Sequence, residues 1–380
     1  MIYIIAGEHS GDFIGSRIIS NMQDQQFYGV GGELMRKHHF TPLFDIKQIN
    51  LIGFLEILPS LLRIIKLQKL VVRDILVKQP SLLITIDSPG FTYPIAKRIK
   101  ALAPHIKLLH IVAPSVWAYK PKRAIKYAKI YHHLLALLPF EPALFTKHGL
   151  ATSFVGYIGL EQYMDCKMRN DDDVVTTNQA IAPTSTTQIC LTCGSRRREI
   201  ATLAPIFINS LNILAKNGAS LRALFVIVKA EDQDQILAIL NSHLLLFSYH
   251  FCYMHQQVVE QSSVALCKSG TNTMQIACKA IPMVICYKPH FLSYWLLKCV
   301  MHIRFACLIN IIANQEIWPE LIGPNCTAKN IAQALQSILA NSRMQTKIDK
   351  TQEILRSVGH HWPKPPSKIA SELIYRILQF

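Results

Sequence analysis

The residues best suited to chemistry are small, hydroxylated, acidic or basic side chains that follow short apolar runs. The first run ends in Gly7-Glu8-His9-Ser10-Gly11-Asp12, where a helical pattern begins. Glycine lets a backbone turn tightly against a ligand, and the free N–H groups at a helix start favour an anion. The loop lacks the third glycine of the dinucleotide-binding G-x-G-x-x-G pattern. Tyr28-Gly-Val-Gly-Gly32 predicts a second glycine turn, which is a weak indication of a site by itself.

A single carboxylate, Asp87, follows the apolar run Leu82–Ile86 and precedes Ser88-Pro-Gly-Phe91. At the carboxyl end of a parallel strand, an acid faces the crevice in which open α/β sheets bind ligands. There Asp87 is suited to act as a general base on a substrate hydroxyl within about 3 Å. The cap of the following helix is an equally good interpretation. Two later runs are followed by Pro and aromatic residues, in Val112–Tyr119 and Leu138–Glu141, which indicates the wall of a shaped crevice.

Basic and hydroxylated residues open two helical patterns in the second half of the chain. Gly194-Ser-Arg-Arg-Arg-Glu199 follows an apolar run. Backbone amides and Arg suit a diphosphate, which Arg grips with two parallel hydrogen bonds, although an exposed basic helix start is the alternative. Lys268-Ser-Gly-Thr-Asn-Thr-Met-Gln275 repeats the hydroxyl-rich turn at a helix start.

The sequence gives little support to a metal site. Asp171-Asp-Asp173 has the D-x-D spacing, but its polar setting without a preceding apolar run favours a solvated loop. Cys190 and Cys193 form one CxxC pair without the second pair that a zinc site needs. The chain contains none of the HExxH, GxSxG and P-loop patterns. We therefore expect no metal and no cofactor.

These motifs need a scaffold that brings strand ends together. Short β-branched runs alternate with longer stretches of helical period, which predicts parallel sheets with crossover helices. The expected strands cover residues 2–6, 82–86, 107–112, 134–138, 189–192, 224–228 and 283–287.

The 380 residues are most simply divided into two α/β domains of ordinary size. A stretch rich in Asn, Asp, Thr and Ser, residues 165–188, predicts a linker or a long loop. We expect a first domain over residues 1–164, a second over 189–364, and a terminal helix over 365–380.

The composition is both basic and apolar. Lys and Arg number 40 against 24 Asp and Glu, which gives a formal net charge of +16, and 50% of the residues are hydrophobic. Positive charge draws a protein to nucleic acid, anionic membrane or phosphorylated substrates. The apolar content excludes a largely disordered chain and favours a membrane surface over nucleic acid.

Neither of the two best apolar stretches predicts a membrane-spanning helix. Glu56 interrupts the first and Lys288, Lys298 and Arg304 interrupt the second, well short of the roughly 20 apolar residues that a span requires. The first eight residues predict a strand rather than a signal peptide. The 10 cysteines then fit reduced thiols in a cytosolic protein.

One predicted helix, residues 59–78, combines apolar and basic faces. Its cations fall within a stripe of roughly 120°, which fits either a surface helix on its own sheet or an interfacial helix on lipid phosphates. Residues 287–305 add the aromatic and basic composition of membrane interfaces. The residues that we expect to face an anionic membrane are Arg63, Lys66, Lys69, Arg73, Trp295 and Lys298.

In this order, and from about residue 2 to 340, the motifs resemble those of the lipid-A-disaccharide synthases. The matching segments are 7–12, 29–32, 53–58, 86–91, 114–119, 138–141, 194–196, 269–273 and 319–321. The Pro-Ser-Val-Trp-Ala segment at 114–118 is the most specific of them. The resemblance implies two Rossmann-like domains whose parallel sheets face each other across a cleft, the GT-B type of fold. It also implies a cytoplasmic enzyme that associates peripherally with the inner membrane.

The resemblance further implies an inverting glycosyl transfer. UDP-2,3-diacylglucosamine would donate its sugar to the 6-hydroxyl of 2,3-diacylglucosamine 1-phosphate, which gives lipid A disaccharide 1-phosphate and UDP. The first domain would bind the acceptor and the second the UDP-sugar, and the terminal helix would pack back on the first domain. The oligomeric state stays open.

Asp87 matches the presumed catalytic aspartate of this family. The residues that match binding positions are Glu8, Ser10, Gly11, Gly194, Ser195, Arg196, Ser269, Gly270, Thr271, Gln275 and Asn310. The sequence departs from the family pattern at Tyr157, Cys193, Gln275 and Ile309. Gln275 replaces a Glu that accepts from the ribose, and its neutral amide forfeits about 1 kcal/mol of a charge-assisted bond. Weaker donor binding is the expected consequence.

Two alternatives remain at this point. A UDP-sugar epimerase has the same fold and would act without an acceptor. A basic nucleic-acid-binding protein would also explain the charge, although the aromatic RNA-binding patterns are missing.

Overall fold

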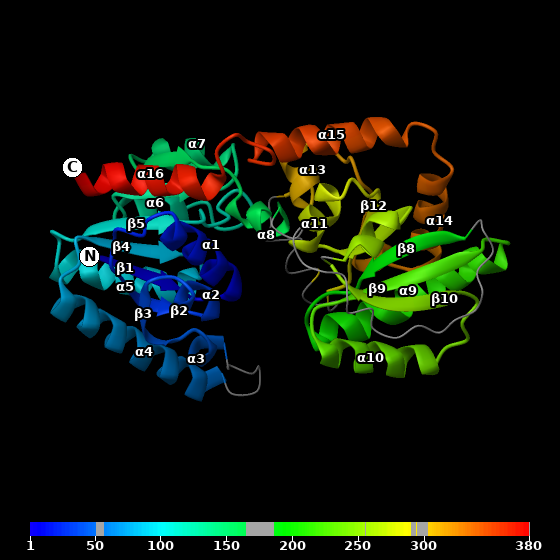
Figure 1. Cartoon of the computed structure of the whole chain (residues 1–380), viewed down its shortest axis with the longest axis horizontal. Helices are drawn as coiled ribbons and strands as arrows, with labels where there is room; N and C mark the ends of the chain where they lie inside the picture. Colours follow the sequence, from blue (N-terminus) through cyan, green and yellow to red (C-terminus); the bar gives the residue numbers. More distant parts are fainter. Residues whose placement is uncertain (51–56, 165–185, 255, 290–293, 295–302, 380) are drawn as a thin grey trace. The chain divides into compact units, whose positions relative to one another are not determined.

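We describe the chain from a computed structural model, in which every residue is described except 51–56, 165–185, 255, 290–293, 295–302 and 380. The chain forms two compact units (Figure 1). The first comprises Met1–Gln162 and Ser357–Phe380, and the second comprises Tyr163–Arg356. Among the described helices, none combines the length and apolarity that crossing a bilayer demands.

The first unit is built on a parallel sheet with the strand order β3-β2-β1-β4-β5-β6-β7. The strands are β1 (Ile2–Ala6), β2 (Phe27–Gly31), β3 (Phe40–Asp45), β4 (Leu82–Ile86), β5 (Lys107–Ile111), β6 (His133–Ala136) and β7 (Ala151–Phe154). The helices are α1 (His9–Ser20), α2 (Glu33–Arg36), α3 (Lys47–Asn50), α4 (Ile57–Lys78), α5 (Pro89–Leu102), α6 (Arg123–Ala128), α7 (Glu141–Thr146), α8 (Glu161–Met164, which runs into the second unit) and α16 (Pro366–Gln379).

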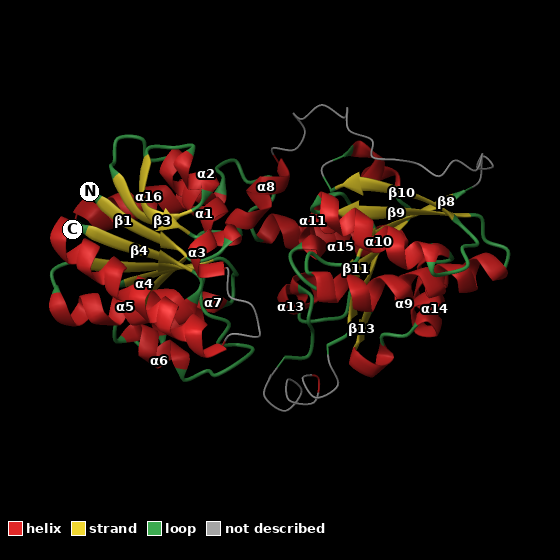
Figure 2. Ribbon diagram, turned by 90° about the horizontal axis from the view of Figure 1, so that it is seen from below, coloured by secondary structure: helices red, strands yellow, loops and turns green. Residues whose placement is uncertain are grey.

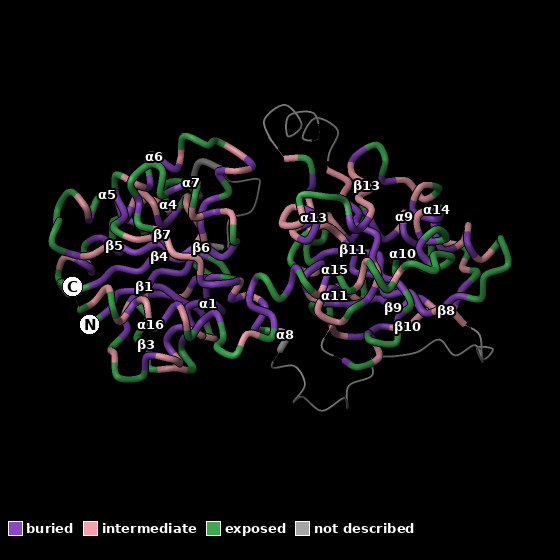
Figure 3. Tube along the Cα trace, turned by 90° about the horizontal axis from the view of Figure 1, so that it is seen from above, coloured by how far each residue is buried: buried purple, intermediate pink, exposed green. Residues whose placement is uncertain are grey.

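Alternating side chains bury both faces of this sheet. On β1, Tyr3 and Ile5 pack against the core under α4 and α5, whereas Ile2 and Ile4 pack against α1 and α16. A strand that is covered on both faces has a continuous apolar sequence. Such a strand is therefore easy to locate from the sequence. Figure 2 shows helices on both sides of these strands, and Figure 3 shows the central strands β1, β4 and β5 as largely buried.

The second unit contains a parallel sheet with the order β10-β9-β8-β11-β12-β13. The strands are β8 (Thr187–Thr192), β9 (Leu221–Ile227), β10 (Ser248–Tyr253), β11 (Val264–Lys268), β12 (Met283–Tyr287) and β13 (Glu320–Ile322). The helices are α9 (Arg197–Lys216), α10 (Ala230–Asn241), α11 (Asn272–Cys278), α13 (Leu308–Ala313), α14 (Ala328–Leu339) and α15 (Met344–Ser357). The predicted α/β class with parallel sheets is therefore confirmed.

The prediction of a glycine turn at Tyr28–Gly32 is wrong, because Phe27–Gly31 forms strand β2. The glycines serve close approach rather than a turn. A Cβ on Gly29 would lie 2.0 Å from the Ile4 carbonyl oxygen, and one on Gly32 would lie 2.5 Å from the Asp12 carboxylate. Gly29 also has a φ of +139°, which disfavours any other residue.

The C-terminal helix α16 packs on α1 within the first unit (Figure 1). Ala370 and Ile374 are fully buried in the cluster that includes Ile18 of α1. The Glu161 carboxylate accepts hydrogen bonds from the Ser367 N–H and hydroxyl, both at 2.7 Å. Glu161 thus satisfies a backbone donor at the start of α16.

Each sheet reverses its strand order at one place, between β1 and β4 in the first unit and between β8 and β11 in the second. Connections leave the two central strands in opposite directions there, an arrangement that in open α/β sheets separates the loops at the carboxyl ends. Ligands of open α/β sheets bind at such switch points. Both predicted groups of site residues follow these central strands.

Candidate active site

Three of the predicted segments meet at the switch point of the first sheet. Gly7 follows β1, Asp87 follows β4, and Val112 follows β5. The Asp87 N–H donates to the Ile111 carbonyl at 3.0 Å, which joins the β4 and β5 ends. A Cβ on Gly7 would lie 2.5 Å from Ser88 Oγ, so glycine lets the β1 and β4 loops touch.

The backbone around Asp87 is strained. Asp87, Ser88 and Val112 have φ values of +47°, +45° and +74°, which non-glycine residues rarely adopt and which cluster at functional sites. Burial raises the pKa of Asp87, while the Ser88 N–H lowers it. Asp87 is not the helix cap, since Ser88 occupies the N-cap position of α5. No salt bridge to Asp87 is present in the described part of the chain, so its half-buried carboxyl is suited to exchange a proton.

The predicted loop 7–12 divides into exposed and structural residues. Glu8 and Ser10 are exposed at the start of α1. Gly11 is buried, and a Cβ on it would lie 3.3 Å from Ala6 Cβ. Because glycine has no Cβ, α1 can approach β1 closely here. The buried Asp12 carboxylate accepts from the N–H groups of Gly32, Leu34 and Met35 at 2.7, 3.0 and 3.2 Å. Asp12 therefore fixes the start of α2.

Glu141 connects the two segments that were predicted as a crevice wall. Its buried carboxylate accepts from Trp117 Nε1 at 3.3 Å and from the Leu137 and Leu138 N–H groups at 3.2 and 3.0 Å. Burial raises the pKa of Glu141 to about 7, and these donors lower it in part. Trp117 and Phe140 pack edge to face at 5.6 Å. The bond from Trp117 to Glu141 is a contact that the sequence pattern did not predict.

At the switch point of the second sheet, a carboxylate lies among positive charges. Glu199 Oε1 is 3.3 Å from Arg196 Nη1 and 3.1 Å from Lys268 Nζ, and Glu199 Oε2 accepts from the Ser195 N–H at 3.3 Å. Arg196 is otherwise free to turn to a ligand, since 81% of its side chain is exposed. A Cβ on Gly194 would lie 2.5 Å from Glu199 Oε2, and its φ of +114° requires glycine. Two cations and the start of α9 thus converge on one anionic group.

Lys268, the last residue of β11, is a candidate that sequence reasoning missed. The predicted residues after it are placed as follows. Ser269 donates to the Ala306 carbonyl at 3.1 Å, Gly270 and Thr271 are exposed, and Gln275 is half-buried on α11. Gly270 has a φ of +158°, and a Cβ there would lie 3.5 Å from Lys268 Nζ.

Asn310 has a structural environment. It is fully buried, and its amide donates to the Trp318 carbonyl and to Glu320, both at 2.8 Å. Its side-chain oxygen accepts from the Ile317 and Trp318 N–H groups at 2.9 and 3.1 Å. These bonds occupy the polar atoms of the side chain, so Asn310 supports the loop before β13.

Helix α4 presents the predicted cations on its surface. Arg63, Lys66, Lys69 and Arg73 are all exposed. Large apolar side chains accompany them: Leu62, Leu70 and Val77 are 59%, 45% and 76% exposed. We call these seven residues the α4 surface. Trp295 and Lys298 lie outside the described residues, as do residues 53–56 of the matching segment 53–58.

The structure adds little to the question of metals. Within the described ranges, no group of three or more His, Cys, Asp and Glu side chains is arranged to hold an ion. Cys190 and Cys193 are buried thiols of β8 and its following loop, and burial raises the pKa of each. Asp171–Asp173 lie outside the described residues.

Comparisons with known sequences point to one family. A family model described as lipid-A-disaccharide synthetase matches residues 2–372. The lipid-A-disaccharide synthase of Rickettsia akari (strain Hartford) is 42% identical over 380 residues, which cover 98% of this chain and 95% of the relative. That of Rickettsia prowazekii (strain Madrid E) is 42% identical over 381 residues, with 98% of each chain covered.

Solved structures share the fold at low identity. The UDP-GlcNAc 2-epimerase from Neisseria meningitidis bound to UDP-GlcNAc superposes with a TM-score of 0.61 at 10% identity, covering 100% of this chain and 99% of the other. The calicheamicin glycosyltransferase CalG4 gives a TM-score of 0.57 at 12% identity, with 100% and 98% covered. These likenesses show a fold of the GT-B type with two parallel-sheet domains.

Proposed function

The chain belongs to the lipid-A-disaccharide synthase family, and from this premise we propose how its residues carry out the reaction. It is a glycosyltransferase that forms the disaccharide of lipid A. The specific substrates that we propose are UDP-2,3-diacylglucosamine as donor and 2,3-diacylglucosamine 1-phosphate as acceptor. The products are lipid A disaccharide 1-phosphate and UDP, with inversion at the anomeric carbon.

Asp87 is the proposed general base. An inverting transfer requires removal of the proton from the acceptor 6-hydroxyl as its oxygen attacks the anomeric carbon. The observation that carries this role is a half-buried carboxyl at the β1/β4 switch point, on a strained backbone. Burial raises its pKa and so makes it a stronger base than an exposed aspartate. Glu8 and Ser10 line the same crevice as acceptor-binding residues.

The diphosphate of the donor binds at the start of α9 in this proposal. Arg196, the Ser195 N–H and Lys268 already surround the Glu199 carboxylate, and a diphosphate presents the same kind of oxygen atoms. Their positive charge would neutralise the charge that develops on departing UDP. Ser269, Gly270, Thr271 and Gln275 would contact the rest of the nucleotide from the neighbouring switch-point loop. Asn310 supports that region from beneath.

The α4 surface is the proposed contact with an anionic membrane. Cations attract lipid phosphates, and exposed Leu and Val side chains enter the headgroup region. Both substrates carry acyl chains in this proposal, so an enzyme held peripherally at the inner membrane would meet them there.

An assay of the purified protein tests the function. Incubation with both substrates should give the disaccharide and UDP in equal amounts. Asp87→Asn should lower kcat by roughly 10²–10⁴-fold, because the amide cannot accept the proton. Unchanged thermal unfolding of the variant would show that the loss is chemical. Full activity of Asp87→Asn, or no disaccharide from the wild type, would refute the assignment.

The epimerase alternative is tested with the same protein. Turnover of UDP-N-acetylglucosamine without an acceptor would favour it. The epimerase neighbours share only the fold with this chain, at 10% identity for the Neisseria enzyme.

A further inference from the structure

A buried hydroxyl in the first unit lacks a hydrogen-bond partner. Tyr127 of α6 is 2% exposed, and within the described part of the chain its Oη is paired with no other group. The neighbouring Tyr131 ring stacks on Tyr127 at 5.2 Å, but its Oη lies 3.1 Å from Thr85 Oγ1. Because an unpaired buried polar group destabilises a fold, the Tyr127 hydroxyl calls for a functional explanation.

The path of the chain places this hydroxyl level with Asp87. Thr85, which contacts Tyr131, lies two residues before Asp87, an advance of about 6.6 Å along a strand. The chain runs from α6 at the carboxyl edge back to the start of β6, and the Tyr131 N–H donates to the Tyr127 carbonyl at 2.9 Å. Tyr127 therefore lies one helical turn, about 6 Å, nearer the carboxyl edge than Tyr131.

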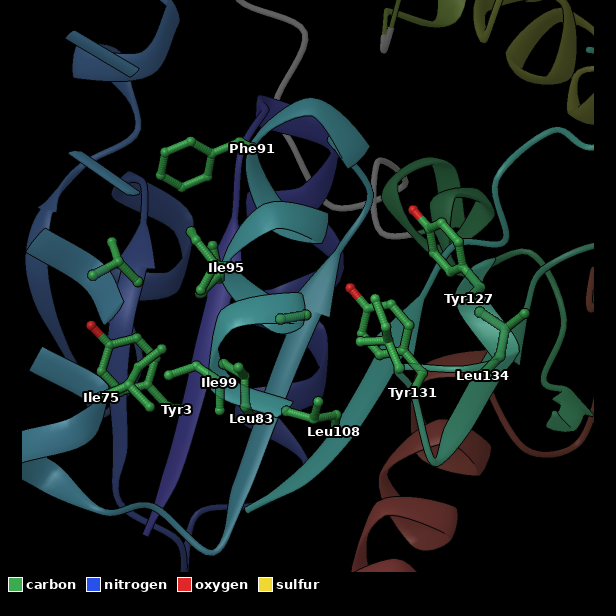
Figure 4. Packing of buried hydrophobic residues seen from close by; sticks show 14 of the residues in the cluster. Tyr3, Ile75, Leu83, Phe91, Ile95, Ile99, Leu108, Tyr127, Tyr131 and Leu134 are labelled. Carbon is green, nitrogen blue, oxygen red and sulfur yellow. The ribbon is translucent and has the colours of Figure 1, made fainter. Parts of the chain in front are cut away.

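Figure 4 shows how the rings of Tyr127 and Tyr131 lie relative to each other. The Tyr127 hydroxyl lies beyond that of Tyr131, toward the end of the sheet where Phe91 lies near the start of α5. The distance along the strand from Thr85 to Asp87 and the distance along the helix axis from Tyr131 to Tyr127 are similar. Tyr127 Oη therefore lies nearer to the Asp87 end of β4 than Tyr131 Oη does, although no hydrogen bond joins Tyr127 to Asp87, both of which the structure describes.

Among the titratable groups that the structure describes around Tyr127, Asp87 is the one acid. Tyr93 of α5 and His110 of β5 pack on its ring at 5.2 and 5.1 Å. Burial raises the pKa of Tyr93 and lowers the pKa of His110 to about 3, so both are neutral near pH 7. Burial raises the pKa of Tyr127 itself, Arg123 lowers it, and Asp87 raises it. The free O–H of Tyr127 therefore has the Asp87 carboxylate as the anion to turn toward.

We propose that Tyr127 is a positioning residue for Asp87, and that its hydroxyl donates a hydrogen bond to the ionised carboxylate and holds it for the acceptor hydroxyl. This inference rests on the proposed role of Asp87 as general base. A donor to the charged form favours that form, so Tyr127 opposes the effect of burial on Asp87. The base then stays ionised over a wider pH range.

The test is the pH dependence of kcat/KM for the acceptor in Tyr127→Phe, with Tyr131→Phe as matched control. Removing the donor from Asp87 should move the acid limb to higher pH by about one unit, and so lower kcat/KM about tenfold below that limb. At a pH low enough to protonate Asp87, the melting temperature of Tyr127→Phe should equal that of the wild type, because the proposed bond forms only with the ionised carboxylate. Tyr131→Phe should keep the limb and lose stability, because Thr85 loses a partner.

Two other titrating groups lie at this edge of the sheet, and they can also affect the pH profiles of kcat/KM. Burial raises the pKa of Glu141 to about 7 and that of Tyr157 to about 12, and Asp87 adds to the latter shift. Both residues are unchanged in the two variants. Their titration is therefore common to all three curves, and the difference between the curves reports on Tyr127.

An unchanged acid limb in Tyr127→Phe, or the same shift in Tyr131→Phe, would overturn the inference. A second measurement separates it from the proposed function. Carboxyl ¹³C NMR can titrate Asp87 directly, with Asp87→Asn to identify its signal. A higher pKa of Asp87 in Tyr127→Phe supports the inference even if the assay shows no disaccharide, and an equal pKa contradicts it even if the assay succeeds.

Discussion

Glu141 shows how a single buried carboxyl ties stability to pH. Its side chain is 4% exposed, and burial raises its pKa from 4.5 to about 7. Between those two values the folded chain keeps a proton that the unfolded chain releases. Unfolding therefore becomes more favourable as pH rises through this window, by up to about 1.4 kcal/mol per pH unit. Below pH 4.5 and above pH 7 the group contributes no slope.

We predict that Glu141→Gln removes this pH dependence. The amide cannot accept from all three donors as the carboxyl group does, so the variant loses stability, and residue 141 then adds no pH dependence of its own. Chemical denaturation at pH 5, 6, 7 and 8 measures both chains. The stability of the wild type relative to the variant should fall between pH 5 and 7. Parallel curves would show that Glu141 is ionised in the folded state throughout.

At this scale the sequence predicted positions better than contacts. Asp87, Gly194 and Arg196 could be placed at strand ends, because apolar runs stop immediately before their loops. The pairing of Glu199 with Lys268 and the unpaired Tyr127 could not be predicted. They depend on which strands become neighbours in the sheet, and local spacing carries no information about that.

Helix α4 combines a buried and an exposed face in a way that makes its surface role testable. Val71, Val72 and Ile75 pack into the first core, while Lys66 and Lys69 are exposed beside Leu70. Helix α16 lies on the opposite face of the same sheet and also carries exposed cations, Lys368 and Arg376. It therefore offers a control with the same change of charge.

We predict that Lys66→Glu/Lys69→Glu weakens binding to vesicles containing anionic phosphatidylglycerol by at least about tenfold, because each cation near the surface contributes about 1 kcal/mol. Lys368→Glu/Arg376→Glu should have a much smaller effect. Vesicle co-sedimentation at low salt measures both, and added salt should weaken wild-type binding. An equal loss from both pairs would mean that net charge, rather than the α4 surface, attracts the protein.

Most of the fully buried strands were predictable. The predicted ranges of β1, β4 and β12 match the structure, because each is a largely apolar run that stops at a glycine or a charged residue. Strands β3, β7, β10, β11 and β13 were missed. Four of these are partly exposed and form no continuous buried run. Strand β11 is buried, but its apolar run is only four residues long. The glycines of β2 misled the prediction, because a glycine needed for close approach looks the same in sequence as one needed for a turn.

The whole chain is organised as two cores, and the first is completed by a distant segment. Ile374 of α16 is fully buried with residues of β1 and α1, although almost the whole chain separates them. Ile331 of α14 is equally buried in the core of the second unit. The two isoleucines are therefore matched probes of the two cores.

We predict that Ile374→Ala and Ile331→Ala each cost about 3 kcal/mol of unfolding free energy, because each leaves a cavity in a packed core. The two substitutions should loosen different sheets. Hydrogen exchange of backbone amides should speed up in β1 and β4 for Ile374→Ala, and in β8 and β11 for Ile331→Ala, because local stability follows the core that a strand belongs to. Equal acceleration in both sheets from either substitution would mean that the chain unfolds as one cooperative body. Exchange confined to α16 in Ile374→Ala would mean that the helix detaches without loosening the sheet that it covers.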